Sequence, residues 1–328
     1  MIKNYFATAL LAIASLGSAA AIAADKPVTF RFGHTLPATD SQHVAALEFA
    51  KRVEARTNGQ IKVKVFPSGT LGNDVSLVTG VRSGTIDIGV TGNPFLTGIS
   101  PNLNVLDLPY LFDNEKQAFG VLDGPIGRGL LDDLGNYGLK GLAFWDLGFR
   151  SFTNNKRPVT KAADINGLKI RTTPNPAHIM AFELLGANPQ PMAFGEVYTA
   201  LESGAIDGQE NPPTIILSSK MYEVQKYLSL TRHAYTAGPV FMNKRKFDKL
   251  KPEYQQIMLE EALAAANYQR DLNAKHQEEA LAELRKHGVE IAANLDVESI
   301  RKVVKGPVHA EFAKKYGDKI LKAIEGQR

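Results

Sequence analysis

The sequence of 328 residues predicts an α/β fold built from two lobes, with a long helix spanning both of them. Three observations support this fold class. Strand-like and helix-like segments alternate, one order of segments occurs twice, and a long stretch near the C-terminal end has neither glycine nor internal proline. Such alternation is typical of a sheet covered by crossover helices. A chain of this length, 44% hydrophobic and 22% charged, suits two domains with their own cores.

The first copy of this order opens with an alternating apolar run at residues 28–34, which is typical of a strand. The predicted elements after it are a helix at 42–56, a strand at 61–66, a helix at 74–82 and a strand at 86–91. The second helix ends in Ser83-Gly84-Thr85-Ile86-Asp87, and Asn93-Pro94 comes just beyond. The first copy therefore begins with the order strand, helix, strand, helix.

The second copy begins with a predicted strand at 168–172 and passes through Pro176 into a helix ending near Gly186. An extended piece at 188–192 follows. The next helix ends in Ser203-Gly204-Ala205-Ile206-Asp207, with Asn211-Pro212 beyond it. Two lobes of one plan, each with loops at the carboxyl ends of its strands, form a natural clamp around a small molecule.

The segments that connect the copies set the predicted lobe boundaries. Helices are expected from Glu115 onward, a strand at 138–144, a new extended stretch at 150–153 and an extended return segment at 233–240. The first crossing between lobes is expected near Leu147 and Gly148. Lobe I is then predicted to contain residues 25–147 and 237–270, and lobe II residues 148–236 and 271–328.

Residues 252–287 predict one long helix, because Pro252 suits a first turn and Gly288 a position just past the end. At 1.5 Å per residue such a helix is roughly 50 Å long. This exceeds one lobe, so the helix is expected to run along both as a spine. The alternative is two shorter helices broken near 269–273.

The first residues have the features of a secretory signal, predicted to occupy 1–24. Lys3 supplies the positive region, residues 6–16 the apolar core, and Ala21-Ile22-Ala23 the small-residue cleavage site. No other stretch approaches the roughly 18 consecutive apolar residues of a membrane span. The protein is therefore expected in the periplasm.

Composition excludes several classes of function. The chain has no cysteine, which removes disulfides, thiolate nucleophiles and cysteine-based metal sites. Its net charge of +4 falls to +3 without Lys3, and the basic residues are interleaved with acidic ones, so no nucleic-acid partner is expected. Seven scattered histidines lack metal-ligand spacing, and no nucleotide-binding loop or Gly-x-Ser-x-Gly elbow occurs. We expect no metal and no cofactor.

Arg171 is the first candidate for a ligand-binding residue, because it lies at the carboxyl end of a predicted strand, where α/β sheets collect ligands. A guanidinium there suits two parallel hydrogen bonds to a carboxylate. Arg150 is a candidate second cation and Asn211 a candidate neutral donor to the same anion. The alternative is that both arginines make surface ion pairs and that Asn211 shapes the turn before Pro212.

The motifs around these residues resemble the extracytoplasmic substrate-binding proteins of TRAP transporters, the tripartite ATP-independent periplasmic family (DctP-like). Four motifs carry the resemblance in the second lobe: Gly167-Leu-Lys-Ile-Arg171, Pro191-Met-Ala-Phe-Gly-Glu-Val-Tyr-Thr-Ala-Leu-Glu202, Ile206-Asp-Gly-Gln-Glu-Asn-Pro212 and Met221-Tyr-Glu-Val-Gln-Lys-Tyr227. Phe32-Gly33-His34 and Pro67-Ser-Gly-Thr-Leu-Gly72 extend it into the first lobe. The resemblance implies a two-lobed fold of the periplasmic-binding-protein kind that closes at a hinge.

By the same resemblance, Arg171 is the carboxylate anchor, Arg150 and Asn211 are ligand contacts, and Phe194 matches an aromatic residue that packs on the ligand. The chain departs from the sialic-acid branch, which has a glutamate where this sequence has Val90-Thr91-Gly92-Asn93. That branch also has an Asn-Ala pair where the first strand of this sequence ends in His34-Thr35. First-lobe selectivity is therefore assigned to four candidates, with two more on the crossing segment: His34, Thr35, Asn93 and Phe95, then Trp145 and Asp146.

Three of these candidates have a structural alternative. Trp145, the only tryptophan, could stack on a sugar ring or lie in the core as an anchor for its strand. Asp146 could accept hydrogen bonds from ligand hydroxyls or pair with Arg150. His34 could donate to a ligand oxygen or satisfy a backbone carbonyl.

The function expected from the resemblance is that of a solute receptor, not an enzyme. It would bind an organic acid, for example a sugar acid such as a uronate, in the cleft between the lobes and deliver it to the small and large TRAP membrane subunits. We expect a monomer. An exported acid-base enzyme acting on organic acids, such as a uronate lyase, is the alternative from another class, and a binding protein for an ATP-driven importer is a third.

Overall fold

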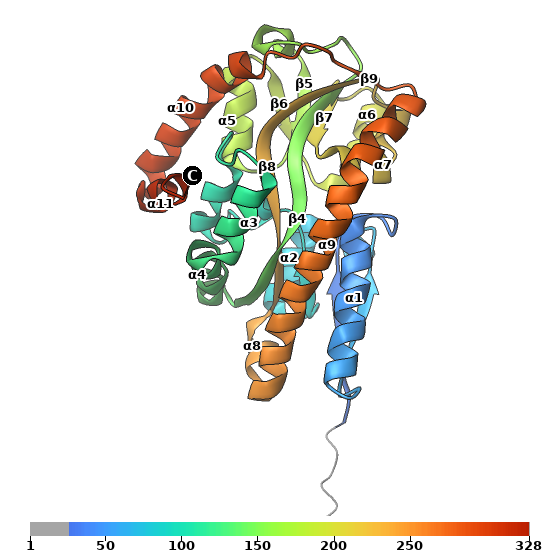
Figure 1. Cartoon of the computed structure of the whole chain (residues 1–328), viewed down its shortest axis with the longest axis vertical. Coiled ribbons are helices and arrows are strands. Elements are labelled where there is room, and N and C mark those ends of the chain that lie inside the picture. Colours follow the sequence, from blue (N-terminus) through green and yellow to red (C-terminus); the bar gives the residue numbers. More distant parts are fainter. Residues whose placement is uncertain (1–25, 328) are drawn as a thin grey trace, which may run out of the picture.

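The computed structural model describes residues 26–327, and the predicted signal at 1–24 lies outside them. Within the described residues one nine-stranded sheet runs through the molecule in the order β2-β1-β3-β8-β4-β7-β5-β6, with β9 beside β8 (Figure 1). The strands are β1 Val28–Gly33, β2 Ile61–Phe66, β3 Ile88–Val90, β4 Leu139–Asn154, β5 Lys169–Thr172, β6 Asn188–Pro191, β7 Gly208–Asn211, β8 Tyr227–Asn243 and β9 Glu290–Ile291. The helices are α1 Ser41–Arg56, α2 Asp74–Ser83, α3 Glu115–Asp123, α4 Pro125–Asp133, α5 Pro176–Leu184, α6 Val197–Glu202, α7 Pro213–Ser218, α8 Lys244–Asp248, α9 Pro252–Lys286, α10 Val297–Tyr316 and α11 Lys319–Glu325.

The repeat predicted from the sequence is confirmed strand by strand. In the first half, β1 pairs in parallel with β2 and β3, and in the second half β5 pairs in parallel with β6 and β7. The two Ile-Asp dipeptides play matching roles, since Asp87 accepts a hydrogen bond from Arg31 N and Asp207 accepts one from Lys169 N (2.6 and 2.8 Å). Each aspartate thus forms a hydrogen bond with the backbone of the first strand in its half.

The two halves are joined by β4 and β8, long antiparallel strands that pass through both. The predicted strand at 138–144 and the stretch at 150–153 belong to one strand, β4, which continues across the expected crossing. The pairing shifts register between Asp146 and Gly148, and Gly148 has a φ of +111°, which only glycine adopts without strain. The return segment is also longer than predicted, because β8 already begins at Tyr227.

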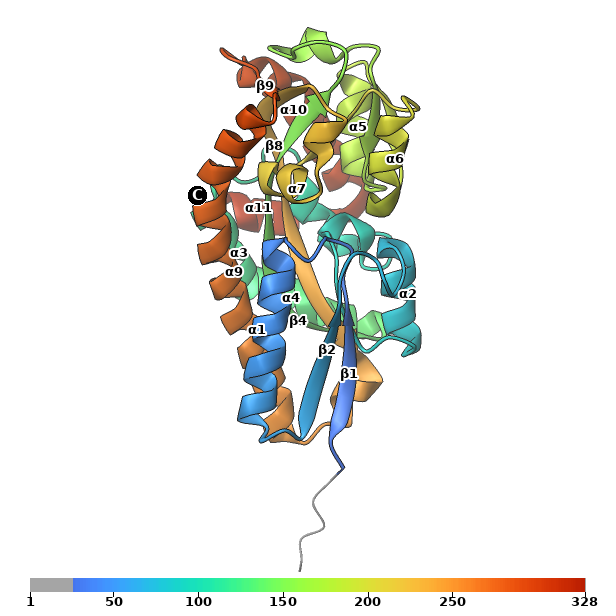
Figure 2. The ribbon, with the colours of Figure 1, turned by 90° about the vertical axis from the view of Figure 1, so that its right-hand side faces the viewer.

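The long helix is a single element, as predicted, and the alternative of two shorter helices is wrong. In Figures 1 and 2, α9 runs along both halves, with α1 beside its lower part. It packs on β4, where Gln269 accepts a hydrogen bond from Asp146 N (2.8 Å). Helix and crossing strand are thus tied together at the level of the register shift. No helix among residues 26–327 combines the length and apolar character needed to span a membrane.

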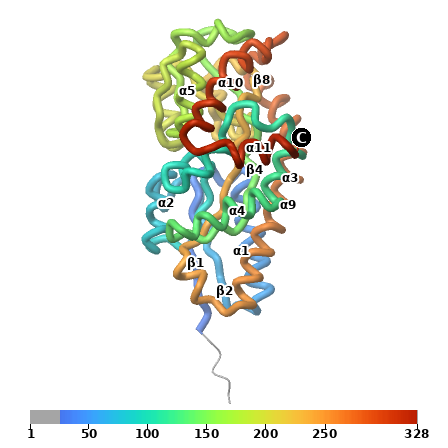
Figure 3. Tube along the Cα trace, turned by 90° about the vertical axis from the view of Figure 1, so that its left-hand side faces the viewer, coloured from blue at the N-terminus to red at the C-terminus, as the bar shows by residue number. Residues whose placement is uncertain are grey.

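The core is divided among several apolar clusters. One lies between the sheet of the first half and helices α1 and α9, around Phe32, Phe49 and Ala262. A larger cluster extends from α2 and α4 to α5 and α10 and so links both halves. The C-terminal helices lie on the opposite side from α1 in Figure 1 and face the viewer in Figure 3: α10 packs on α5, while α11 contacts α4. The predicted lobe boundaries stay a prediction.

Candidate functional site

The carboxyl ends of β1, β3, β5 and β7 meet at a cavity between the two halves. Its free volume is about 30 Å³, room for roughly one or two water molecules, so its walls lie close together in this structure. Its lining is contributed by both halves and comprises Thr35, Leu36, Gln42, Asp74, Thr91, Gly92, Pro94, Phe95, Leu147, Arg150, Arg171, Thr173, Phe194, Asn211, Ile215 and Thr236. Six of the ten residues singled out in the sequence therefore lie at one cavity: Thr35, Phe95, Arg150, Arg171, Phe194 and Asn211.

Arg171 is the most unusual group at this cavity. Its side chain projects from β5 and the residue is 1% exposed. Nε and Nη2 both donate to the same carbonyl, Met192 O, at 3.1 and 2.8 Å. Within residues 26–327 it forms no ion pair with a carboxylate. Burial, reinforced by the nearby charge of Arg150, lowers the pKa of Arg171 to about 10. The site thus contains a buried cation without an ion-pair partner among the described residues.

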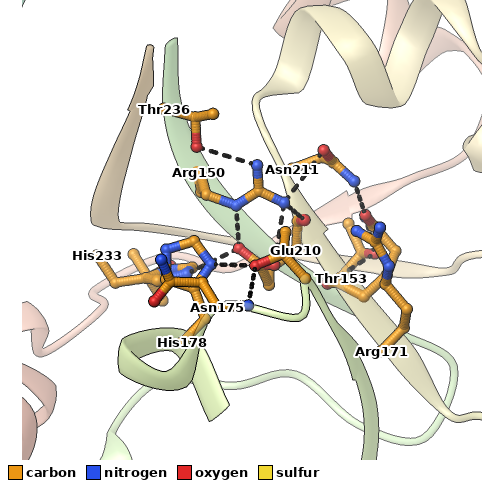
Figure 4. A network of polar contacts seen from close by, with 12 residues as sticks. Arg150, Thr153, Arg171, Asn175, His178, Glu210, Asn211, His233 and Thr236 are labelled. Atoms are coloured by element: carbon orange, nitrogen blue, oxygen red, sulfur yellow. Dashed lines mark hydrogen bonds and ion pairs between the residues drawn. The ribbon is translucent and has the colours of Figure 1, made fainter. Parts of the chain in front are cut away.

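Arg150, by contrast, is already neutralised. Its guanidinium forms a buried ion pair with Glu210 and also donates to Thr236 Oγ1 (3.1 Å), as Figure 4 shows. His233 Nε2 lies 3.2 Å from the same carboxylate. Burial by itself would raise the pKa of Glu210, but the charge of Arg150 and the contact with His233 outweigh it and lower the pKa. Arg150 therefore does form an ion pair, but the pair is buried and does not lie on the surface.

Asn211 and Phe194 complete the second-half wall of the cavity. Asn211 Oδ1 accepts from Arg150 Nη2 (3.2 Å), and its amide donates to Gln209 Oε1 (2.6 Å). Phe194 is half-buried, and its ring borders the apolar cluster of Leu36, Leu147 and Ile215. This wall therefore offers an aromatic face next to an oriented amide.

The first-half wall contains a carboxylate that our sequence analysis did not single out. Asp74, the first residue of α2, is 2% exposed. It accepts hydrogen bonds from Thr35 Oγ1 (2.9 Å), Thr91 Oγ1 (2.6 Å) and, across the cavity, Phe194 N (3.2 Å). The rule that pointed to Arg171 would have found it, since Asp74 follows the carboxyl end of β2. Gln42, at the start of α1, is a second lining residue that was missed.

Four candidates from the sequence analysis do not line this cavity. Trp145 is fully buried in the first-half core, where Nε1 donates to Ala262 O (3.0 Å), so the core alternative is the one observed. Asn93 is fully buried and donates to Leu103 O and Asp107. Asp146 bonds Tyr235 and Asn273 at the register shift, and not Arg150. Nε2 of His34 lies 3.0 Å from Nδ1 of His43.

The chemistry of this arrangement favours holding an anion over transforming one. The titratable groups in the lining are Arg150, Arg171 and Asp74. The carboxylate of Asp74 accepts hydrogen bonds, and that of Glu210 is paired with Arg150. No cluster of three metal-ligating side chains occurs within the described part of the chain.

Comparison with known proteins agrees with this geometry. Residues 32–315 match the model of the bacterial extracellular solute-binding proteins, family 7. The chain belongs to this family. A 2,3-diketo-L-gulonate-binding periplasmic protein of Escherichia coli is 44% identical over 90% of this chain and 91% of its own length. The chain is therefore a solute-binding protein of the TRAP type, and the fold and function expected from the sequence are confirmed at the level of the family.

Two solved structures of the same kind are similar over almost their whole length. A TRAP periplasmic solute-binding protein of Polaromonas sp. JS666, bound to D-erythronate, is 38% identical with a TM-score of 0.88, covering 90% of this chain and 98% of that one. A sugar acid binding protein of Advenella mimigardefordensis, in complex with galactonate, is also 38% identical with a TM-score of 0.88, covering 92% and 99%. Both share the two-lobed fold described above.

Proposed function

We propose that this chain is a periplasmic receptor that binds a sugar acid through its carboxylate at Arg171 and releases it unchanged to the membrane subunits of a TRAP transporter. The six lining residues predicted from the sequence are proposed as ligand contacts. The receptor acts as a monomer and performs no chemistry on the acid.

The observation that carries this proposal is the buried, unpaired guanidinium of Arg171. A lowering of its pKa from 12.5 to about 10 corresponds to a cost on the order of 3 kcal/mol for keeping it charged at neutral pH. A carboxylate bound across Nη1 and Nη2, the edge of the guanidinium that Met192 O does not occupy, would offset that cost with charge-assisted hydrogen bonds. A purely structural role would not require a cation at this place, because Met192 O is its only hydrogen-bond acceptor among the described residues.

The proposed ligand class follows from the similar proteins together with the lining. D-Erythronate, galactonate and 2,3-diketo-L-gulonate all combine one carboxylate with a hydroxylated chain. Beside Arg171 this cavity offers the amide of Asn211 and the half-buried ring of Phe194, groups that suit hydroxyls and the apolar face of a carbon chain. A sugar acid therefore fits better than an unsubstituted fatty acid.

Substitution of Arg171 tests the anchor. Truncation to alanine should weaken binding at least about thirtyfold, because removing a desolvated charge contact costs on the order of 2 to 5 kcal/mol. Arg171→Lys keeps the charge without the planar fork and should lie between wild type and Arg171→Ala. Isothermal titration calorimetry with D-erythronate and D-galactonate measures the affinities.

Two controls accompany this measurement. Arg245→Ala removes an exposed arginine far from the cavity lining and should bind as wild type does. Nuclear magnetic resonance of the acid recovered after long incubation should show it chemically unaltered. Near-normal affinity of a folded Arg171→Ala protein would refute the anchor, and conversion of the acid would refute the receptor.

A further inference from the structure

The cavity contains an unsatisfied amide at the end formed by α1. Gln42 is 1% exposed and lines the cavity, yet its Nε2 has no hydrogen-bond partner. Its backbone N–H donates to Asp40 Oδ1 (2.9 Å) at the N-terminus of α1. A buried amide without a partner costs roughly 1 to 3 kcal/mol, and such groups in native proteins commonly await a ligand or water.

Asp74 stands on the same wall and has the opposite preference. A carboxylate can accept about four hydrogen bonds, and three are supplied by Thr35, Thr91 and Phe194 N. The remaining capacity suits a donor. A hydroxyl can donate to Asp74 and also accept from Gln42, whereas a carboxylate can only accept and would meet Asp74 with like charge.

The charges of the lining point the same way. Arg150 is compensated by Glu210, so it offers little net attraction to a second anionic group. The charged side chains that remain in the lining are Arg171 and Asp74. Arg171 is the cation of the lining that has no ion-pair partner among residues 26–327, so it matches one carboxylate, whereas a second carboxylate would be desolvated beside the charge of Asp74.

We propose that Gln42 and Asp74 together select for a hydroxyl at the end of the ligand remote from its carboxylate, so that this receptor takes aldonate-like monocarboxylates and rejects the corresponding dicarboxylates. This inference rests on the proposed function of the same cavity. It names two specificity-determining residues beyond the anchor, both from the first half of the molecule.

Matched pairs of acids test the selection at the distal end alone. D-Erythronate and meso-tartrate differ only in whether the fourth carbon is a hydroxymethyl group or a carboxylate, and D-galactonate and galactarate differ in the same way at the sixth carbon. The wild-type protein should bind the aldonate of at least one pair, and its partner at least about a hundredfold more weakly. Asp74→Asn, which keeps the shape of the side chain, should reduce that ratio at least about tenfold.

Gln42→Leu tests the amide. Its affinity for the preferred aldonate should fall at least about tenfold, while the unliganded protein unfolds at the same or a higher temperature, because leucine removes an unsatisfied buried group. Gln256→Leu, a change at an exposed position of α9, is the matched control and should leave binding unchanged.

Failure of the proposed selectivity and failure of the proposed receptor function give different results. Wild-type protein that binds both members of a pair equally, or prefers the dicarboxylate, overturns the selection while the receptor function stands. Gln42→Leu protein that binds the aldonate normally overturns the role of Gln42. If the wild-type protein binds none of a broad panel of organic acids, the proposed function itself fails.

Discussion

Two buried arginines at one cavity illustrate how the same residue type serves different ends. Arg150 has its counterion in Glu210, so its burial is compensated and its fork is held in place by Thr236 and Asn211. Arg171 has only a carbonyl as acceptor. Breaking the Arg150–Glu210 pair would leave an isolated charge in the interior, whereas the guanidinium of Arg171, which we propose as the carboxylate anchor, has no ion-pair partner among the described residues.

The buried His178 makes stability depend on pH. Burial lowers the pKa of His178 to about 3, with the charge of Glu210 acting against burial and that of Arg150 adding to it. Because the folded state keeps this imidazole neutral, the unfolded chain binds the proton first as the pH falls below about 6.5. The contribution of His178 to stability is therefore present at neutral pH and is lost progressively between about pH 6.5 and 3.

Replacing His178 with glutamine should make the loss of stability in acid shallower. The free energy of unfolding of the wild type relative to His178→Gln should fall by on the order of 1 kcal/mol for each pH unit below 6. Urea denaturation at pH 7, 6, 5 and 4 measures this difference. Burial raises the pKa of Asp40, Asp107 and Asp146, so protonation of these carboxyl groups favours the folded state as the pH falls. Both proteins share this opposite effect, so it cancels in the difference between them. Parallel pH profiles would contradict the assignment.

At the scale of elements, the crossing strand β4 depends on a glycine at its register shift. Gly148 has a φ of +111°, and a Cβ added there would lie 3.4 Å from Pro212 Cβ. Gly148→Ala should therefore lower the free energy of unfolding by about 1 to 3 kcal/mol through backbone strain. Thermal denaturation checks this value.

A second glycine provides the control for that substitution. Gly129 lies within α4 at an exposed position, and a Cβ added there would meet nothing within 4 Å. Gly129→Ala should stabilise the protein by roughly 0.5 to 1 kcal/mol, because alanine restricts the unfolded chain and favours the helix. If both alanine variants changed stability alike, the strain argument for β4 would fail.

At the scale of the whole molecule, three aspartates of the first half accept hydrogen bonds from groups of the second half. Asp74 accepts from Phe194 N, Asp40 from Ser218 Oγ (2.8 Å) and Asp107 from Asn175 Nδ2 (2.8 Å). These contacts come from different elements, and that of Asp74 crosses the cavity itself, so the two halves are held together in this structure. A ligand that contacts both walls would favour this arrangement over a more open one.

Closure should be visible in solution. Adding a saturating concentration of a bound sugar acid should reduce the radius of gyration of the wild-type protein in small-angle X-ray scattering. Hinge closure is the behaviour known for periplasmic binding proteins in general. Arg171→Ala at the same acid concentration should show no contraction. A wild-type scattering profile that does not change upon binding would contradict ligand-driven closure.

The sequence by itself determined the repeated strand-helix order, the single helix α9 and the strand ends that carry Arg171 and Asn211. These features depend on local periodicity, on proline and glycine positions, and on motifs, all of which are properties of contiguous residues. The family resemblance then added Phe194, Thr35 and Phe95, which the structure places at the same cavity as Arg150.

Only the tertiary structure decided which face of β4 meets the cavity and which meets the core. Side chains alternate along a strand, but β4 shifts register between Asp146 and Gly148 and again between Arg150 and Phe152, and each irregularity resets the alternation. Counting from Arg150 therefore could not place Trp145, which packs under α9 in the core. The partners of Asp74 and the isolation of Gln42 likewise depend on residues distant in sequence, because burial and hydrogen-bond satisfaction arise only when separate elements come together.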